Sequence, residues 1–330
     1  MLKIVFMGSD AIALPALNWL VGGGIAQVVA VFTQPDRAAG RGQKVQANAI
    51  KLWALERGLP VLQPEKIGAP EQQQLADLQP DLTLVMAYGH ILKQDVIATP
   101  RLGTLNLHTS VLPQYRGASP IQTAIACGEK ETGVTLMRLV RELDAGPVAD
   151  VERVAIESLD TATEVEARLA QACVPLLARC LPAIAAGTQI FTAQNADQVT
   201  FCRRLEKSDG GLDFTQPAAA LAARSNGLNP WPGCSVVIAG QTVKLGLADV
   251  GSLIDYQPTG PGVVLGADPE GLLVDTGQGI LRLRKLQRPG GRMLPAAEFL
   301  RGLSVAPGTT LASAPMPPLV GRVPFPFRKA

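Results

Sequence analysis

Three residues of this 330-residue chain have the types and spacing for acyl-transfer chemistry. Asn106 and His108 stand two apart at the end of an apolar run, so on a strand they would point to the same face. An Asn side chain can donate a hydrogen bond to an oxyanion, and an imidazole can move protons near neutral pH. Asp144, in the later run Leu143-Asp144-Ala145-Gly146, could orient the imidazole and stabilise its charge. Residue chemistry alone leaves open an ordinary core or surface role for His108.

Strand-like and helix-like segments alternate through the first part of the chain and predict the element that carries this pair. Apolar runs bounded by turn residues predict buried strands. They occur at residues 2–7, 26–32, 81–87, 103–107, 133–140 and 148–156, and a long helical pattern covers 161–186. The alternation predicts a doubly wound, mostly parallel α/β sheet. Ligands bind beyond the carboxyl ends of such strands, which is where Asn106 and His108 stand.

The sequence changes in character after Gly187, where short β-rich runs bounded by Gly and Pro replace most helical patterns. These runs cover residues 234–239, 242–247, 262–265, 272–276 and 280–286, and they predict a small β-barrel. We therefore expect four parts: a catalytic domain at 1–188, a linker at 189–205, a barrel domain at 206–303 and a tail at 304–330. The many prolines of the tail predict loose order.

Charge is unevenly distributed along the chain, although the net charge is only +2. Residues 201–330 carry 14 Lys and Arg against 9 Asp and Glu, whereas residues 1–200 carry 16 against 19. A basic C-terminal part is typical of a protein that contacts phosphates, and a solvated charged face is the alternative.

The cysteines and the first residues predict the compartment of the protein. The five cysteines form no CxxC pair and none lies near a histidine in the sequence, which disfavours a zinc site. An odd, scattered set fits a reducing environment. The chain opens directly into a strand, without a signal or transit pattern, and no apolar run reaches the length of a membrane span. We expect a cytoplasmic protein without a metal or a membrane partner.

Three segments after the early strands indicate what the protein binds. Gly8-Ser9-Asp10 is not a GxGxxG fingerprint, which disfavours a nicotinamide cofactor. The Gly-rich loop 33–44 carries Arg37, Arg41 and Lys44, and is either a mobile surface loop or an arm that reaches a phosphate backbone. The segment 86–91 could form the wall of an apolar pocket for a planar ligand, with His90 outside the reacting centre.

Taken together, these motifs resemble the methionyl-tRNA formyltransferase family, within the folate-dependent formyltransferases. The run from Asn106 to Pro120 is similar to the family's catalytic Asn and His segment, and 143–146 is similar to its catalytic Asp turn. The loop 32–44 resembles the one that the tRNA enzymes insert toward the acceptor stem, and 229–233 resembles a C-terminal signature. The similarity runs from residue 1 to about residue 302.

The resemblance implies a Rossmann-like catalytic domain, a C-terminal OB-like barrel, and formyl transfer from 10-formyltetrahydrofolate to the α-amine of methionyl initiator tRNA. Asn106, His108 and Asp144 would be catalytic, no metal would be needed, and the protein would act as a monomer. Arg37, Arg41 and Lys44 would approach the acceptor stem. The residues implied to contact the folate are Met86, Ala87, Tyr88, Gly89, Ile91, Ser110, Val111, Leu112, Pro113, Val140 and Leu143.

The chain departs from the family pattern at a few positions, and two other functions are possible for these motifs. The chain has Ser9-Asp10 after the first strand, Val111 for a usual Leu and Gln43 where a basic residue is frequent, and these changes put the grip on tRNA in question. A sugar-nucleotide N-formyltransferase would share the three catalytic residues and the folate pocket. A noncatalytic tRNA-binding module would share the fold. The basic loop and the basic C-terminal region argue against the first alternative, and the intact catalytic residues argue against the second.

Overall fold

The structure is a computed structural model that describes residues 1–39 and 44–326. Contacts between residues divide it into two compact units. The first unit comprises Met1–Arg116, Gly133–Val154 and Glu166–Val199. The second unit comprises Gly117–Thr132, Ala155–Val165 and the chain from Thr200 onward. Each unit is made of several segments of the chain, whereas the sequence predicted four consecutive parts. The domain boundaries expected at 188, 205 and 303 therefore stay a prediction.

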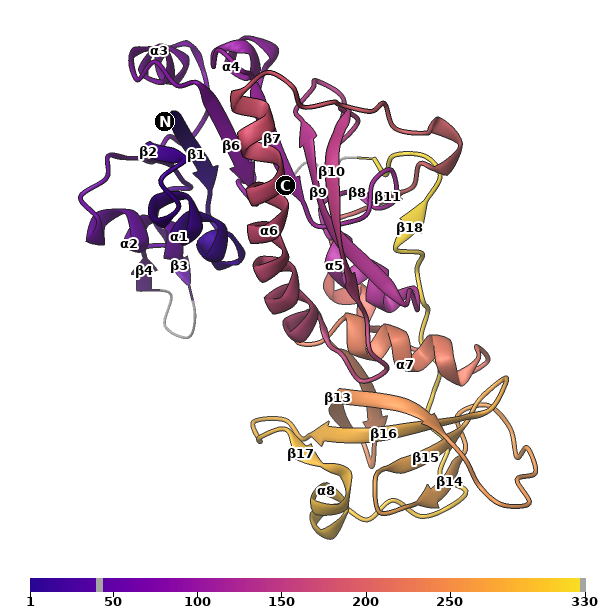
Figure 1. The fold of residues 1–330 in the computed structure, drawn as a ribbon. Helices are drawn as coiled ribbons and strands as arrows, with labels where there is room; N and C mark the ends of the chain where they lie inside the picture. The colour runs from indigo at the N-terminus through magenta and orange to yellow at the C-terminus, as the bar shows by residue number, and fades with distance from the viewer. Residues whose placement is uncertain (40–43, 327–330) are drawn as a thin grey trace. The chain divides into compact units, whose positions relative to one another are not determined.

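The first unit is built on a seven-stranded sheet with the order β10-β9-β7-β6-β1-β2-β5 (Figure 1). The strands are β1 (Leu2–Gly8), β2 (Ala26–Phe32), β5 (Val61–Leu62), β6 (Leu82–Met86), β7 (Thr104–His108), β9 (Glu131–Arg138) and β10 (Val148–Ala155). Pairing is parallel from β7 through β6, β1 and β2 to β5, and antiparallel between β7 and β9. The predicted α/β class and its mostly parallel sheet are confirmed.

Helices connect or follow these strands. They are α1 (Leu14–Gly22), α2 (Ala49–Glu56), α3 (Ala69–Asp77), α4 (Gln94–Ala98) and α6 (Ala162–Ala185). Local chemistry sets their ends: the Asn48 side chain accepts a hydrogen bond from the backbone nitrogen of Lys51 and caps α2. The sequence did not predict α3 and α4. Polar residues occupy most of α3, so its pattern lacks an apolar stripe.

Helix α6 is 24 residues long and lies along the sheet (Figure 1). By length and composition alone it is apolar enough to cross a membrane, so the expectation that no run reaches that length was wrong. Charged residues interrupt the run in the sequence, but the mean hydropathy stays high at 1.2. Leu169, Cys173 and Leu176 are buried, and the sulfur of Cys173 lies 3.9 Å from that of Met86 on β6. Packing in the core accounts for this apolar character.

The second unit contains an antiparallel sheet with the order β12-β13-β16-β15-β14, with β17 beside β16. Its strands are β12 (Cys234–Ile238), β13 (Gln241–Gly251), β14 (Val264–Ala267), β15 (Leu272–Asp275), β16 (Ile280–Gln287) and β17 (Leu294–Pro295). The five predicted strands are confirmed. The helices of this unit are α5 (Pro120–Ala126), α7 (Ala218–Gly227) and α8 (Ala296–Gly302), and the sequence did not predict α7 and α8. Phe214, Leu221 and Phe299 lie in the core between helices and sheet.

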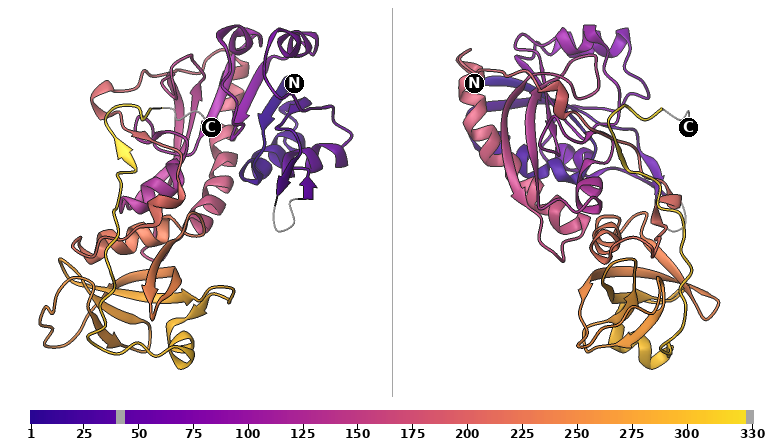
Figure 2. Two further views of the ribbon diagram at one scale, coloured as in Figure 1. Left: turned by 180° about the vertical axis from the view of Figure 1, so that it is seen from behind. Right: turned by 90° about the vertical axis from the view of Figure 1, so that its right-hand side faces the viewer.

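The C-terminal segment is ordered along the second unit, contrary to the loose tail expected from its prolines (Figure 2). The backbone nitrogens of Leu311 and Ala314 donate to carbonyls at 2.8 Å each, and β18 (Val320–Gly321) pairs antiparallel with β11 (Phe201–Cys202). Leu311 and Leu319 are buried in the core. The prediction counted prolines and overlooked these leucines, which anchor the segment by burying apolar surface.

A network of ion pairs joins β13, β16 and the turn before β15. Arg282 donates to both carboxylate oxygens of Asp249 at 2.8 Å and to Asp268 at 3.1 Å. Arg284 donates to the same Asp249 at 2.8 Å and to Glu270 at 3.1 Å. Burial opposes ionisation of Asp249, but the hydrogen bonds from the two arginines outweigh it and hold its pKa below the usual 3.8. These arginines therefore stabilise the sheet.

We expect Asp249→Asn to destabilise the second unit by about 2 kcal/mol at pH 7, because hydrogen bonds to charged groups are lost. Since the folded pKa is lowered, this contribution is fully present above pH 3.8 and is lost as pH falls through the folded value. Thermal unfolding at pH 7 and pH 3 measures it, with Asp255→Asn on an exposed loop as control. An equal loss at both pH values would contradict the assignment.

Candidate active site

Strand β7 places Asn106 and His108 at the carboxyl edge of the sheet, as the sequence predicted. The strand lies between β6 and β9, with Asn106 in register with Val85 and Met137. Both side chains are buried, Asn106 with 9% and His108 with 6% of its surface exposed. Their alternation along the strand puts them on one face. Two polar groups are therefore held side by side where water is largely excluded.

His108 is held from two directions. Its Nε2 lies 3.0 Å from the backbone carbonyl of Tyr115, and its Nδ1 lies 3.7 Å from Oδ2 of Asp144. A carbonyl only accepts, so Nε2 donates in this arrangement. Asp144 stands beyond hydrogen-bond distance but close enough to stabilise a positive ring, and only 7% and 13% of the two side chains are exposed. The structure brings the three predicted catalytic residues together.

The turn that carries Asp144 has a strained backbone. Asp144 has a φ of 48°, in the left-handed region that favours glycine. Two residues later, a Cβ on Gly146 would lie 1.8 Å from the carbonyl oxygen of Arg138, so no other residue fits without moving the turn. The glycine in the Leu-Asp-Ala-Gly run is thus required by a close backbone approach.

The loop after His108 is fixed by Thr135 on the neighbouring strand β9. The Thr135 hydroxyl donates to the carbonyl of Ser110 at 2.6 Å and accepts from the backbone nitrogen of Leu112 at 3.1 Å. The Ser110 hydroxyl in turn donates to the carbonyl of Gln114 at 2.6 Å. Sequence reasoning missed Thr135 and the Tyr115 carbonyl, because neither position carries a local signal.

Several residues implied to contact the folate lie at the end of β6 or just after it, and they differ in how far they are buried. Met86 and Tyr88 are buried in the core, whereas Ile91 is 81% exposed. Burial raises the pKa of Tyr88, so its hydroxyl stays protonated. The carbonyl of Tyr88 accepts a hydrogen bond from Gln34 at 3.1 Å, a contact that the sequence did not predict. Ile91 and the half-exposed Leu143, which directly precedes Asp144, offer apolar surface to solvent.

Among the remaining residues implied for the folate, Ala87 and Gly89 are exposed with φ values of 47° and 81°, and Leu112 is buried. Val111, Pro113 and Val140 are half-buried. His90 packs edge-on against Tyr88, with ring centroids 5.0 Å apart. The other histidine of the chain thus lies outside the group formed by Asn106, His108 and Asp144.

The basic loop forms a hairpin of β3 (Arg37–Ala39) and β4 (Lys44–Gln46). Arg41 lies outside the described residues. Asp36 anchors the base of the hairpin, since it accepts from Gln63 at 2.8 Å and from Lys51 at 2.6 Å. The Gln63 hydrogen bond, and then that of Lys51, hold the pKa of the Asp36 carboxyl below its usual 3.8. Arg37 and Lys44 project from a fixed base into solvent.

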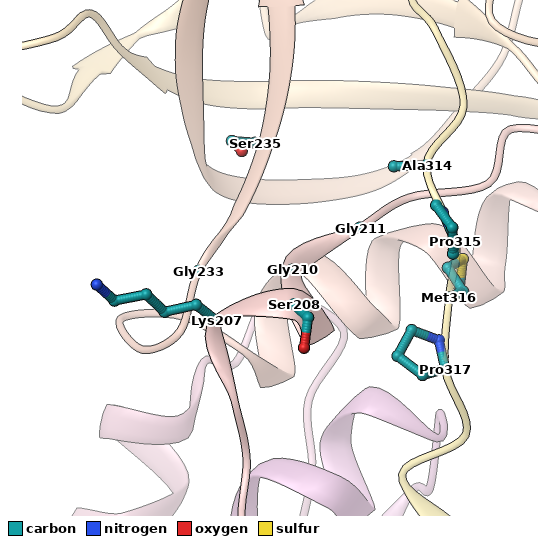
Figure 3. Close-up of a pocket in the computed structure, with 10 residues that line it drawn as sticks. All are labelled: Lys207, Ser208, Gly210, Gly211, Gly233, Ser235, Ala314, Pro315, Met316 and Pro317. Carbon is teal, nitrogen blue, oxygen red and sulfur yellow. The ribbon is translucent and has the colours of Figure 1, made fainter.

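A cavity of about 530 Å³ opens in the second unit, between the segment 207–211, the start of β12 and the C-terminal segment (Figure 3). Lys207, Ser208 and Ser235 are its polar side chains, and the other lining residues are Gly, Ala, Pro and Met. None of the predicted site residues lines it. Within residues 1–39 and 44–326, no cluster of three or more His, Cys, Asp or Glu could hold a metal ion.

Comparison with known families gives this site its class. The family model described as "Formyl transferase" matches residues 2–181, and that described as "Formyl transferase, C-terminal domain" matches residues 204–304. The fold and the site define a formyltransferase.

Curated relatives narrow this class. The chain is 40% identical to the methionyl-tRNA formyltransferase of Methylococcus capsulatus, over 92% of this chain and 98% of the relative. It is 43% identical to that of Xylella fastidiosa strain 9a5c, over 91% of this chain and 97% of the relative. The chain belongs to the methionyl-tRNA formyltransferase family.

Solved structures support the fold. An N-formyltransferase from Helicobacter canadensis, in complex with folinic acid and dTDP-3-aminofucose, is 18% identical with a TM-score of 0.65, over 88% of this chain and 100% of that chain. HypX from Aquifex aeolicus, in complex with tetrahydrofolic acid, is 19% identical with a TM-score of 0.57, over 91% of this chain and 47% of that chain. At this identity, the likeness concerns the fold alone.

We expect Gly146→Ala to destabilise the protein by about 1–3 kcal/mol, the usual cost of forcing an atom into packed backbone. The added carbon would meet the Arg138 carbonyl at 1.8 Å. Gly22→Ala is the matched control, because a carbon there meets nothing within 4 Å. Thermal unfolding of both variants measures the effect. Equal stability of the two would show that the Asp144 turn tolerates a larger residue.

Proposed function

We propose that the protein transfers a formyl group from 10-formyltetrahydrofolate to the α-amine of methionine on initiator tRNA. The observation that carries this proposal is a buried Asn106, His108 and Asp144 group in a chain about 40% identical to methionyl-tRNA formyltransferases along nearly its whole length. The bacterial origin of those relatives and the charged tRNA substrate favour a cytoplasmic enzyme. An OB-like form of the antiparallel sheet in the second unit is part of the same proposal.

In the proposed reaction, a bond forms between the methionine nitrogen and the formyl carbon, and the bond from that carbon to N10 of the folate breaks. Asn106 would donate a hydrogen bond to the formyl oxygen as negative charge develops on it. The amine must lose one proton and N10 must gain one, so a group that exchanges protons near neutral pH is needed beside the reacting carbon. His108 is the only histidine in the group.

The contacts of His108 offer a partner to each ring nitrogen. A doubly protonated imidazole would have the Tyr115 carbonyl at Nε2 and the Asp144 carboxylate at Nδ1 as its two partners. Such a ring would stabilise the oxyanion together with Asn106. To pass its Nε2 proton, His108 must release the Tyr115 carbonyl. The low exposure of the pair keeps water from screening this charge.

The carboxyl edge of the sheet fits a folate as donor of the formyl group. The exposed Ala87 and Ile91 and the half-buried Val111 and Pro113 supply apolar groups beyond the carboxyl ends of the neighbouring strands β6 and β7. A planar ring system can stack on such walls while its formyl group faces the polar residues. When bound, the folate supplies an activated formyl carbon, and the chain supplies the oxyanion donor and the proton exchange.

The hairpin β3–β4 distinguishes a tRNA acceptor from a small amine. Arg37, Lys44 and, by the sequence prediction, Arg41 would approach acceptor-stem phosphates. The alternative acceptor is an amino-sugar nucleotide, since the N-formyltransferase from Helicobacter canadensis shares the fold. A sugar nucleotide needs no basic arm, so the hairpin favours tRNA.

We expect Asn106→Ala and His108→Ala each to lower kcat for formyl transfer to methionyl-tRNA by at least about 100-fold, the usual cost of losing an oxyanion donor. Binding of tRNA should be retained, because both side chains are more than nine-tenths buried and offer little surface to the tRNA. Formylation assays and filter binding measure the two effects. His90→Ala, at the other histidine, should stay within a few-fold of wild type. Near-normal turnover of His108→Ala would reject the catalytic assignment.

We expect Lys44→Ala to raise KM for tRNA and to reduce the slope of log affinity against log salt by about one, as for a lost phosphate contact. Lys3→Ala removes an exposed charge at the amino end of β1, opposite the site, and should change neither quantity. The same assays should offer an amino-sugar nucleotide to the wild-type protein. Transfer to the sugar alone would replace the proposed acceptor.

A further inference from the structure

Gln194 lies in a segment that is pinned against the sheet of the first unit. This segment follows α6, and Thr192 exchanges two backbone hydrogen bonds of 2.8 Å with Val148 at the start of β10. Beside it, the guanidinium of Arg138 lies 4.1 Å from the centroid of the Phe191 ring. The backbone that carries Gln194 is therefore fixed next to the ends of β9 and β10.

The side-chain amide of Gln194 uses its whole hydrogen-bonding capacity. Its Nε2 donates to the carbonyls of Asp144 and Gly146, both at 2.8 Å. Its Oε1 accepts from Nε and Nη2 of Arg116, at 3.0 and 2.7 Å. A primary amide has two donor hydrogens and two acceptor sites, so all four are occupied and the group cannot turn without losing bonds.

These four bonds join the two segments that hold His108. On one side is the strained turn of Asp144, whose left-handed φ of 48° persists only if neighbouring groups hold it. On the other side is Arg116, which directly follows Tyr115, the residue whose carbonyl holds Nε2 of His108. Burial lowers the pKa of Arg116, while the charge of the nearby Asp144 opposes that shift, so the two charged groups lie close enough to interact.

We propose that Gln194 is a positioning residue that sets the placement of the Asp144 carboxylate and the Tyr115 carbonyl around His108. The inference rests on the proposed function and deepens it. Nothing in the local sequence around Gln194 indicates such a role, because it lies 50 residues from Asp144 and 78 from Arg116 in the chain.

The first test is Gln194→Ala, assayed for formyl transfer. Small misplacements of catalytic groups have large effects on rate, so we expect kcat to fall at least about tenfold, with KM for both substrates within about twofold of wild type. Gln189→Ala is the matched control, because Gln189 lies on the same segment and also binds two backbone carbonyls, those of Ala149 and Ile190. The control should keep the wild-type kcat.

Gln194→Glu separates positioning from loss of folding. It keeps the size and the acceptor for Arg116 but replaces the amide donor with oxygen, which faces the carbonyls of Asp144 and Gly146. We expect kcat to fall as in Gln194→Ala. A wild-type kcat in both variants would overturn the proposal.

The decisive measurement combines Gln194→Ala with Asp144→Asn. Once the Asp144 charge is gone, Gln194 can act only through the Tyr115 carbonyl, so its removal should cost clearly less than in the wild-type background, whereas a purely structural role would give the full product of both losses. Full multiplicative losses would overturn the proposal.

A failure of the proposed function is distinguishable from a failure of this proposal. In that case the wild-type protein would not formylate methionyl-tRNA, or Asp144→Asn alone would leave kcat unchanged.

Discussion

The placement of one imidazole between a backbone carbonyl and a carboxylate is the constraint on which the site depends. Nε2 of His108 lies 3.0 Å from the Tyr115 carbonyl, and Nδ1 lies 3.7 Å from Asp144. Strand β7 supplies the ring, the loop behind it supplies the carbonyl, and the turn between β9 and β10 supplies the carboxylate. Because the pair is buried, each contact acts in a low-dielectric setting where small displacements carry large electrostatic effects.

Backbone strain collects around this point. Ala87 after β6, Tyr115 in the loop after β7 and Asp144 after β9 all have positive φ values, between 47° and 58°. Such conformations cost on the order of 1–3 kcal/mol each and persist where surrounding contacts over-determine them. The hydrogen bonds of Thr135 and Gln194 provide such contacts. The carboxyl edge of the sheet is therefore a place where packing elsewhere maintains an otherwise unfavourable backbone.

The charges of the second unit show why counting basic residues overstates a nucleic-acid surface. Arg282 and Arg284 are engaged with Asp249 and its acidic neighbours, and Arg203 donates to Asp209 at 2.9 and 2.5 Å. These cations stabilise the fold and are already neutralised by partners. The hairpin residues Arg37 and Lys44 are exposed, and the ion pair of Arg37 with Glu65 is a long one of 3.8 Å at the surface, so that hairpin is the stronger candidate for contact with phosphates.

The sequence by itself determined most of the elements and which residues are the candidates for the chemistry. Most strands of both units, helix α6 and the placement of Asn106 and His108 at a strand end follow from apolar periodicity and residue spacing, which are local properties. Residue chemistry also singled out Asp144 as a partner for the imidazole, and motifs shared with a known family strengthened that prediction. Helices without an apolar stripe, such as α3, escaped the same reasoning.

Tertiary structure alone decided how these residues are held. The Tyr115 carbonyl, Thr135 and Gln194 reach the site through the folded backbone and through partners far away in the chain, so residue type does not reveal them. The C-terminal segment is also held in place by tertiary contacts, because Leu311 and Leu319 are buried in a core that other segments build. Local patterns specify secondary structure, whereas hydrogen bonds and burial between distant segments exist only once the chain has folded.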